Sequence, residues 1–296
     1  MKNSLLTGIA SIALIGAAFG AGAVLAALPR GGQAAAAPEA SLPRPVVLDP
    51  SQLEAQAAIL YDPQTGQVLF QKNANTALPL ASLTKLMTAQ AVLENRDPST
   101  LVTITADDLK PEGDWGFRPG DVVPLSDLLR FGLVASSNDA MAAAASSLGS
   151  GYLDAMNNIA QELNLTKTYF LNSTGLDLSS DTAGAYGSAF DLARLTAEFY
   201  KKYPALLGHT TEPVVSITVG GRMLSAKATA EPLQNIPGFM GGKTGYTDLA
   251  GGNLAAVFDL EIGRPVVAVV MHSSETGRFA DIRTLINAAR AAAQTP

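Results

Sequence analysis

The sequence lacks cysteine altogether and contains only two histidines, His209 and His272, in 296 residues. Without cysteine the chain has no disulfide bond, thiol nucleophile, iron–sulfur cluster or cysteine-ligated zinc. The two histidines stand in no H-E-x-x-H pattern, a histidine signature of catalytic zinc sites. We therefore expect no metal site and no other cofactor.

Positive charge is scarce as well. The chain has 20 lysines and arginines against 26 aspartates and glutamates, which gives a formal net charge of −6 at pH 7. Its basic residues form no cluster with interleaved aromatic side chains, and an acidic protein repels the phosphate backbone. Nucleic acid is therefore not an expected partner.

Apolar residues, by contrast, are plentiful. They make up 47% of the chain, which is enough to bury the core of a folded domain. Residues 1–29 carry a single charge, on Lys2, ahead of a long apolar run, a pattern typical of an export signal. The run is long enough to span a bilayer, and the small residues that follow it offer cleavage sites. A cleaved signal peptide and an N-terminal membrane anchor both stay open, and in either case the rest of the chain is expected to be exported.

The remainder of the chain divides into two parts. Residues 30–55 are rich in proline, alanine and glycine and are predicted to be a linker, and residues 56–296 have the patterns of one folded domain. Strand patterns lie near the two ends of that domain, at 57–61, 67–70, 214–219, 223–224, around 243, 252–260 and 265–271. Helical patterns cover 82–94, 128–135, 139–148, 152–163, 188–203 and 276–293. This order predicts an α/β (α+β) fold, in which an antiparallel sheet is flanked by helices and a mostly helical lobe lies beside it.

The first motif with chemical meaning is Ser82-Leu83-Thr84-Lys85, at the start of a predicted helix. A serine and a lysine three residues apart lie on the same face of a helix, one turn from each other. A lysine that burial keeps partly neutral accepts the proton of such a serine and makes it a nucleophile. An isolated match is usually no more than a capping serine and a solvated lysine, so the motif needs support from elsewhere in the chain.

Two further motifs follow in order, Ser136-Ser137-Asn138 between two predicted helices and Gly242-Lys243-Thr244-Gly245 near a predicted strand. The first by itself is a common helix-capping sequence. The second is not a phosphate-binding loop, because Pro237 occupies the position of the required first glycine and a strand, not a helix, follows.

Together, the order S-x-x-K, S-x-N and K-T-G resembles that of the penicillin-recognising serine enzymes, and more narrowly the D-alanyl-D-alanine carboxypeptidases among the low-molecular-mass penicillin-binding proteins. The resemblance covers most of residues 57–290. Sequences around and between the motifs share it, notably 61–66, 81–89, 136–140, 156–157, 168–177 and 241–247. The β-lactamase/DD-peptidase-like fold that it implies is the sheet-plus-lobe arrangement predicted above.

The resemblance also implies a role for each motif residue. Ser82 would be the acylated nucleophile and Lys85 its proton acceptor, while Ser136 would relay a proton. The implied substrate-binding residues are Asn138, Lys243, Thr244, Gly245 and Tyr246. The backbone amides of Ser82 and Tyr246 would form the oxyanion hole. We also expect the charge of Lys243 to depress the pKa of Lys85 and to attract a substrate carboxylate.

The implied function is removal of the terminal D-alanine from peptidoglycan stem peptides that end in D-Ala-D-Ala, with consequences for the cell wall and cell shape. β-Lactam antibiotics would then be covalent inhibitors. The implied place is the cell envelope, in the periplasm or at the outer face of the cytoplasmic membrane. Since the sequence ends at Pro296 without a C-terminal anchor, we expect any attachment to the membrane to come from an uncleaved N-terminal segment.

Three other functions stay open. An endopeptidase that cuts peptidoglycan cross-links would use the same residues, and a non-catalytic peptidoglycan-binding module would share the fold. A β-lactamase of class A would need a Glu-x-x-x-Asn element, whereas Glu162-Leu163-Asn164 has the wrong spacing. Residues 226–231 also lack the Asn-Thr-Asn run expected before the third motif, and His272 and Trp115 are expected to be structural.

Overall fold

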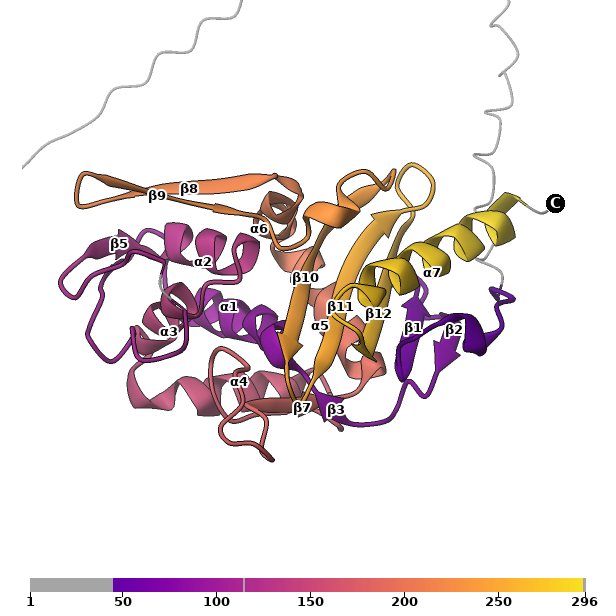
Figure 1. The fold of residues 1–296 in the computed structure, drawn as a ribbon, viewed down its shortest axis with the longest axis horizontal. Helices are drawn as coiled ribbons and strands as arrows, with labels where there is room; N and C mark the ends of the chain where they lie inside the picture. The colour runs from indigo at the N-terminus through magenta and orange to yellow at the C-terminus, as the bar shows by residue number, and fades with distance from the viewer. Residues whose placement is uncertain (1–44, 114, 295–296) are drawn as a thin grey trace, which may run out of the picture. The chain divides into compact units, whose positions relative to one another are not determined.

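The computed structural model describes residues 45–113 and 115–294, so the predicted targeting segment and most of the predicted linker lie outside the described residues. A five-stranded antiparallel sheet forms the centre, in the order β10-β11-β12-β1-β2 (Figure 1). Its strands are β1 (Ala57–Tyr61), β2 (Val68–Lys72), β10 (Phe239–Thr247), β11 (Gly251–Asp259) and β12 (Pro265–Ser273). Because β1 pairs with β12, the two ends of the domain meet inside one sheet, as the strand patterns predicted.

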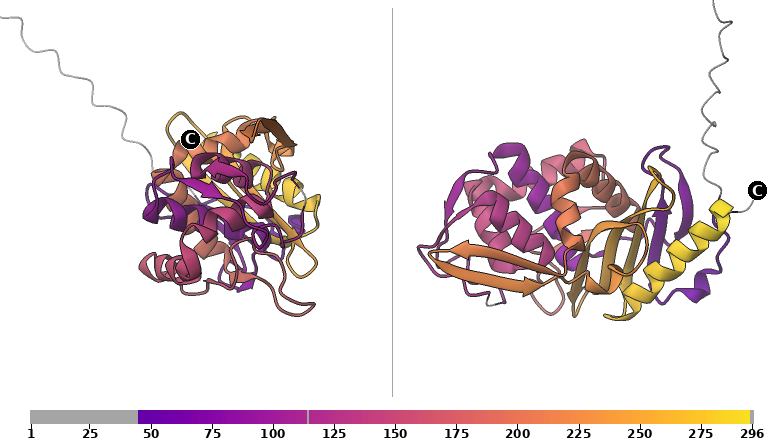
Figure 2. Two further views of the ribbon diagram at one scale, coloured as in Figure 1. Left: turned by 90° about the vertical axis from the view of Figure 1, so that its left-hand side faces the viewer. Right: turned by 90° about the horizontal axis from the view of Figure 1, so that it is seen from above.

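Both faces of this sheet are buried, because alternate side chains of a strand point to opposite sides. In β1, Ala57 and Ile59 belong to one hydrophobic cluster and Ala58 and Leu60 to the other. Helix α7 (Gly277–Gln294) covers one face, and α5 (Ala189–Lys202) covers the face toward the helical lobe (Figures 1 and 2).

The helical lobe is built around α1 (Thr84–Asn95), which is buried along most of its length. Around it lie α2 (Leu125–Val134), α3 (Asn138–Ser146), α4 (Tyr152–Glu162) and α6 (Pro204–Gly208). Gly132 allows helices α2 and α3 to approach closely, because any side chain at this position would overlap Met141. Short strands complete the lobe, namely β3 (Leu78–Pro79), β4 (Leu101–Thr103), β5 (Val122–Pro124), β6 (Tyr169–Phe170) and β7 (Ala185–Gly187).

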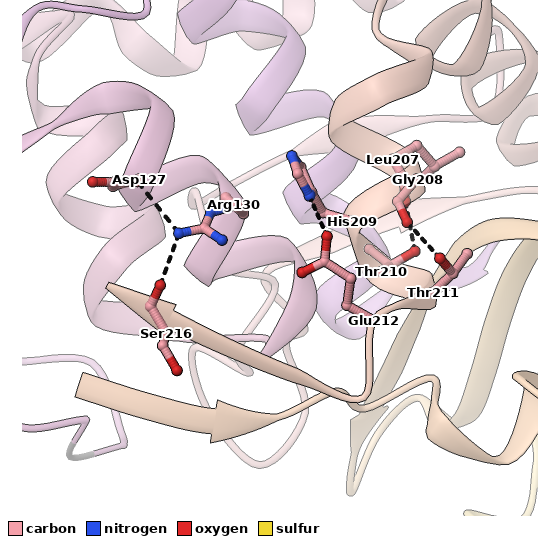
Figure 3. A network of polar contacts seen from close by, with 9 residues as sticks. All are labelled: Asp127, Arg130, Leu207, Gly208, His209, Thr210, Thr211, Glu212 and Ser216. Carbon is pink, nitrogen blue, oxygen red and sulfur yellow. Dashed lines mark hydrogen bonds and ion pairs between the residues drawn. The ribbon is translucent and has the colours of Figure 1, made fainter. Parts of the chain in front are cut away.

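A two-stranded hairpin, β8 (Val214–Val219) and β9 (Arg222–Lys227), extends beside α2 (Figures 1 and 2). Arg130 of α2 donates a hydrogen bond to the Ser216 carbonyl at 2.8 Å and lies 3.6 Å from Asp127 (Figure 3). The described part of the chain also contains the 3₁₀ turns η1 (Pro50–Gln52), η2 (Ala81–Leu83), η3 (Gly149–Gly151), η4 (His209–Thr211) and η5 (Glu231–Leu233).

The predicted fold class is confirmed, and several boundaries differ from the prediction by one to three residues. Helix α2 begins at Leu125, three residues early, because Pro124 adopts an extended conformation as its N-cap and leaves Ser126 inside the first turn. Helix α3 begins at Asn138, and the side chain of Ser137 accepts the Ala140 amide as its cap. The folded part also reaches back into the predicted linker, because the apolar side chains of Val46 and Leu53 are buried.

Among the described residues, no helix has both the length and the apolar character needed to cross a bilayer. The apolar run that predicted a signal or an anchor falls outside them.

Candidate active site

Ser82 lies in the 3₁₀ turn η2, between β3 and the start of α1. The preceding residue, Ala81, has a φ of 48°, in the left-handed region that costs an L-residue energy. Two glycines allow other segments to contact this turn. A side chain at Gly175 would overlap the Ala81 carbonyl oxygen, and one at Gly245 would come within 3.1 Å of the Ser82 amide nitrogen. The nucleophile turn is therefore held between the loop that contains Gly175 and strand β10.

Lys85 is fully buried one helical turn after Ser82. Its Nζ donates hydrogen bonds to Ser82 Oγ at 2.7 Å, Asn138 Oδ1 at 2.7 Å and the Thr174 carbonyl at 2.8 Å. These three acceptors match the three hydrogens of an ammonium group. Burial lowers the pKa of Lys85 from 10.5 to about 7, because the charged form loses its hydration. A large fraction of Lys85 is therefore a neutral amine near pH 7, the form that accepts a proton from serine.

Burial lowers the pKa of Lys85, and the repulsion between the two lysines that the sequence led us to expect lowers the pKa of Lys243. Lys243 is itself fully buried, on β10. Its pKa lies well below the usual value, first because of burial and then because of repulsion from Lys85 and Arg278. The interior therefore disfavours a positive charge on both lysines.

The second motif forms the opposite side of the site, at the junction of α2 and α3. Ser136 has a φ of 59°, and its Oγ accepts a hydrogen bond from Lys243 Nζ at 2.8 Å. Asn138 Nδ2 donates to the Glu112 carbonyl at 2.6 Å, which directs Asn138 Oδ1 toward Lys85. The fold thus places the first, second and third motifs in one hydrogen-bonded group.

The third motif lies on β10, the edge strand of the central sheet. Lys243 Nζ also donates to the Thr244 carbonyl at 2.8 Å. Thr244 Oγ1 donates to Thr229 Oγ1 at 2.6 Å. The strand is supported from η4, where Thr210 Oγ1 accepts the Gly242 amide at 2.8 Å and donates to the Leu207 carbonyl at 2.7 Å (Figure 3).

Sequence reasoning missed three contributors to the site. Thr229 belongs to the stretch that departs from the family pattern, yet its hydroxyl contacts Thr244. Arg278, near the start of α7, is buried and donates to the Gly245 carbonyl at 2.7 Å, and its Nε has no hydrogen-bond partner within the described residues. Thr174 takes part through its backbone carbonyl, so its side-chain type carries no signal.

A cleft of about 1390 Å³ adjoins these residues. Ser136, Asn138 and Tyr246 are among the residues that line it, and Tyr246 is half exposed. Trp115 also lines the cleft and packs edge-on against Phe131, with ring centroids 5.9 Å apart. Away from the cleft, exposed His272 lies with Nδ1 3.1 Å from the Ala250 carbonyl oxygen. Across residues 45–113 and 115–294, no three histidine, aspartate or glutamate side chains are grouped so as to hold a metal ion.

The serine and buried lysine on this sheet-and-helix scaffold place the chain in the structural class of the penicillin-binding proteins. Within this class, a family model described as D-alanyl-D-alanine carboxypeptidase matches residues 44–275, and the chain belongs to that family.

Individual relatives agree with this assignment. The D-alanyl-D-alanine carboxypeptidase DacD of Escherichia coli (strain K12) is 32% identical over 255 residues, which are 80% of this chain and 63% of that protein. The crystal structure of D-alanyl-D-alanine carboxypeptidase from Mycobacterium tuberculosis H37Rv superimposes with a TM-score of 0.74 at 28% identity, covering 85% of this chain and 95% of that one. Penicillin-binding protein D2 from Listeria monocytogenes in its ampicillin-bound form superimposes with a TM-score of 0.67 at 28% identity, covering 80% of this chain and 97% of that one. The chain spans about three fifths of the length of the curated relatives that it matches first, 61% and 63%.

Proposed function

We propose that this chain is a serine-type D-Ala-D-Ala carboxypeptidase that trims peptidoglycan stem peptides through an acyl-enzyme on Ser82. The observation that carries the proposal is the 2.7 Å hydrogen bond between Ser82 Oγ and the Nζ of a buried lysine whose pKa is about 7. Burying a lysine costs stability, and here its amino group contacts a half-buried serine hydroxyl that could be acylated. Family membership supplies the substrate class.

The acylation step follows from these contacts. Neutral Lys85 takes the proton of Ser82, and Ser82 Oγ attacks the carbonyl carbon of the penultimate D-alanine. The backbone amides of Ser82 and Tyr246 would stabilise the oxyanion that forms. Ser136, hydrogen-bonded to Lys243, would relay this proton from Lys85 to the leaving nitrogen as the peptide bond breaks and D-alanine departs, which leaves Lys85 neutral again. Lys85 would then take a proton from the water that attacks the ester and return it to Ser82 Oγ as the acyl group leaves.

Recognition of the terminal carboxylate is assigned to the β10 side of the site. Lys243 and Thr244 present an amino group and a hydroxyl there, a bound carboxylate would favour the ammonium form of Lys243, and the buried guanidinium of Arg278 adds a cation next to Gly245. Charge-assisted hydrogen bonds of this kind are the strong ones in a dry cleft. The proposed site therefore favours a substrate with a free C-terminal carboxylate.

A peptide that ends in D-Ala-D-Ala is expected to be hydrolysed at least about tenfold faster as the free acid than as its C-terminal amide, because amidation removes the charge-assisted contact and leaves the scissile bond unchanged. Release of free D-alanine or D-alaninamide measures the two rates. Lys243→Ala should reduce the preference. Lys243→Arg keeps the charge but changes its shape and reach, and it should restore the preference only in part.

The same assay separates the alternatives. Equal cleavage of acid and amide by the wild-type protein would contradict the carboxylate site and favour an endopeptidase. Rapid turnover of penicillin without peptide cleavage would indicate a β-lactamase. If neither peptide cleavage nor an acyl-enzyme is detected, a non-catalytic peptidoglycan-binding module is the function that remains. β-Lactams are proposed as covalent inhibitors, which the ampicillin-bound state of the Listeria relative supports for that protein.

The proposed place of action is the cell envelope, with residues 1–29 as the export signal and residues from 56 onward as the catalytic domain. In an exporting host we expect the protein outside the cytoplasm. If the N-terminal segment is retained, the protein should stay with membranes after a high-salt wash, because salt does not screen apolar burial. If it is removed, intact mass should place the new N-terminus near Ala37 or Pro38, in the soluble envelope fraction. Full-length protein in the cytoplasm would contradict export.

A further inference from the structure

The loop from Asn172 to Leu176 is shaped by one side chain. Asn172 Oδ1 accepts hydrogen bonds from the Gly175 amide at 2.7 Å and the Thr174 amide at 3.2 Å. Its Nδ2 donates to the Leu176 carbonyl at 2.8 Å. A side chain at Gly184, just before β7, would overlap both this amide group and the Leu176 carbonyl, so the glycine leaves room for the arrangement. A side-chain amide that bonds its own following backbone fixes the conformation of such a turn.

This loop meets helix α1 through two successive carbonyls. The Thr174 carbonyl accepts Lys85 Nζ at 2.8 Å, and the Ser173 carbonyl accepts Thr88 Oγ1 at 2.8 Å. Lys85 and Thr88 lie three residues apart, on one face of α1. The loop also touches the nucleophile turn, because Gly175 lies directly against the Ala81 carbonyl. The position of the Thr174 carbonyl is therefore set by Asn172 from one side and by α1 from the other.

We propose that Asn172 is a positioning residue for the reaction, which holds the Thr174 carbonyl where it orients the Lys85 amino group toward Ser82. This inference rests on the proposed function. Lys85 has three polar partners, and two of them, Ser82 and Asn138, belong to the recognised motifs. The third partner is a main-chain atom, so the residue that controls it is the one that fixes the turn.

The proposal has a consequence for titration. A carbonyl that accepts a hydrogen bond stabilises the ammonium form of Lys85, so loss of this contact lowers the pKa of Lys85 further. Acylation needs the neutral amine, so the acidic limb of the rate profile should move to lower pH. Lys243 on β10 repels Lys85, and Arg278 on α7 in turn repels Lys243. The described wall of the cleft carries the charged residues Asp107, Asp108, Lys110, Glu112, Asp177 and Asp248. None of the variants below changes any of these groups.

The experiment measures the second-order rate of acylation by a fluorescent penicillin between pH 5 and 9, on the full chain. For Asn172→Ala we expect a maximal rate at least about tenfold lower and an acidic limb displaced by roughly one pH unit to lower pH. Thr88→Val keeps the size of the buried side chain and removes the hydrogen bond to the Ser173 carbonyl, together with longer ones to the Thr84 carbonyl at 3.4 Å and Met156 Sδ at 3.6 Å. We expect the acidic limb of the rate profile of Thr88→Val to move to lower pH as well. If Asn172→Ala does not fold, the result for Thr88→Val alone tests the positioning role.

The matched control is Asn157→Ala. The side-chain amide of Asn157 also binds the backbone, at the Phe170 amide (2.9 Å), the Phe170 carbonyl (3.0 Å) and the Leu153 carbonyl (3.0 Å), and within the described residues it has no hydrogen bond to the 174–176 turn. Its limb should coincide with that of the wild-type protein. The positioning role is overturned if the acidic limb of the rate profile stays at the wild-type pH in Asn172→Ala or Thr88→Val. It is also overturned if the limb moves by the same amount in Asn157→Ala. If the wild-type protein forms no acyl-enzyme at any pH, the proposed function itself fails and this inference falls with it.

Discussion

Ser82→Ala is expected to abolish covalent labelling by penicillin and to slow peptide hydrolysis by on the order of 10⁴-fold or more. Ser82 is the only hydroxyl that the structure places 2.7 Å from Lys85 Nζ within the described residues, so no other serine is activated in the same way. Removing one hydroxyl from a half-buried side chain should leave the fold intact. Mass spectrometry of the acylated protein, followed by peptide mapping, checks both the loss and the position of the adduct.

Ser146→Ala is a suitable control for this experiment. Ser146 lines the cleft, and its hydroxyl donates to the Ala143 carbonyl at 2.9 Å, inside its own helix. Its variant should be labelled at the wild-type rate. An adduct found on any serine other than Ser82, or labelling that survives in Ser82→Ala, would contradict the assigned nucleophile.

Lys85→Met is expected to lower the acylation rate by about 10²- to 10⁴-fold, the usual contribution of a positioned general base. It should not lower the temperature of thermal unfolding, because methionine fills similar space and removes a group whose charge is costly to bury. Loss of activity without loss of stability is the combination that separates a catalytic base from a structural lysine. Stopped-flow acylation and calorimetry measure the two quantities.

The wild-type pH profile tests the same assignment. The pKa of Lys85 is lowered to about 7, so below that pH the amine is protonated and cannot accept the serine proton. The acylation rate should therefore fall by about tenfold for each further pH unit below 7. Lys72→Met is the control, since the Nζ of Lys72 only donates to the Leu53 carbonyl at the far side of the sheet. A wild-type rate that stays level from pH 5 to 8 would argue against Lys85 as the base.

Local patterns were sufficient for most of the secondary structure. The hairpin that begins at Ala57, the long helix after Ser82 and the strands after Val214 all follow from period and turn chemistry within a few residues. Helix starts were less predictable, because Pro124 and Ser137 cap helices whose first turns also contain other capping residues. Such choices depend on which backbone conformation the surrounding fold allows.

The sequence by itself determined the order of the three motifs, the residue types at the site and the family. Only the tertiary structure decided how those residues interact, because the contacts join positions far apart in the chain. Lys85 meets Asn138 and the Thr174 carbonyl across 53 and 89 residues, and Lys243 meets Ser136 across 107. The pKa of Lys85 likewise depends on burial, which is a property of everything packed around α1 and of no single motif. A backbone carbonyl such as that of Thr174 exists at every residue, so only the folded chain shows which one the lysine contacts.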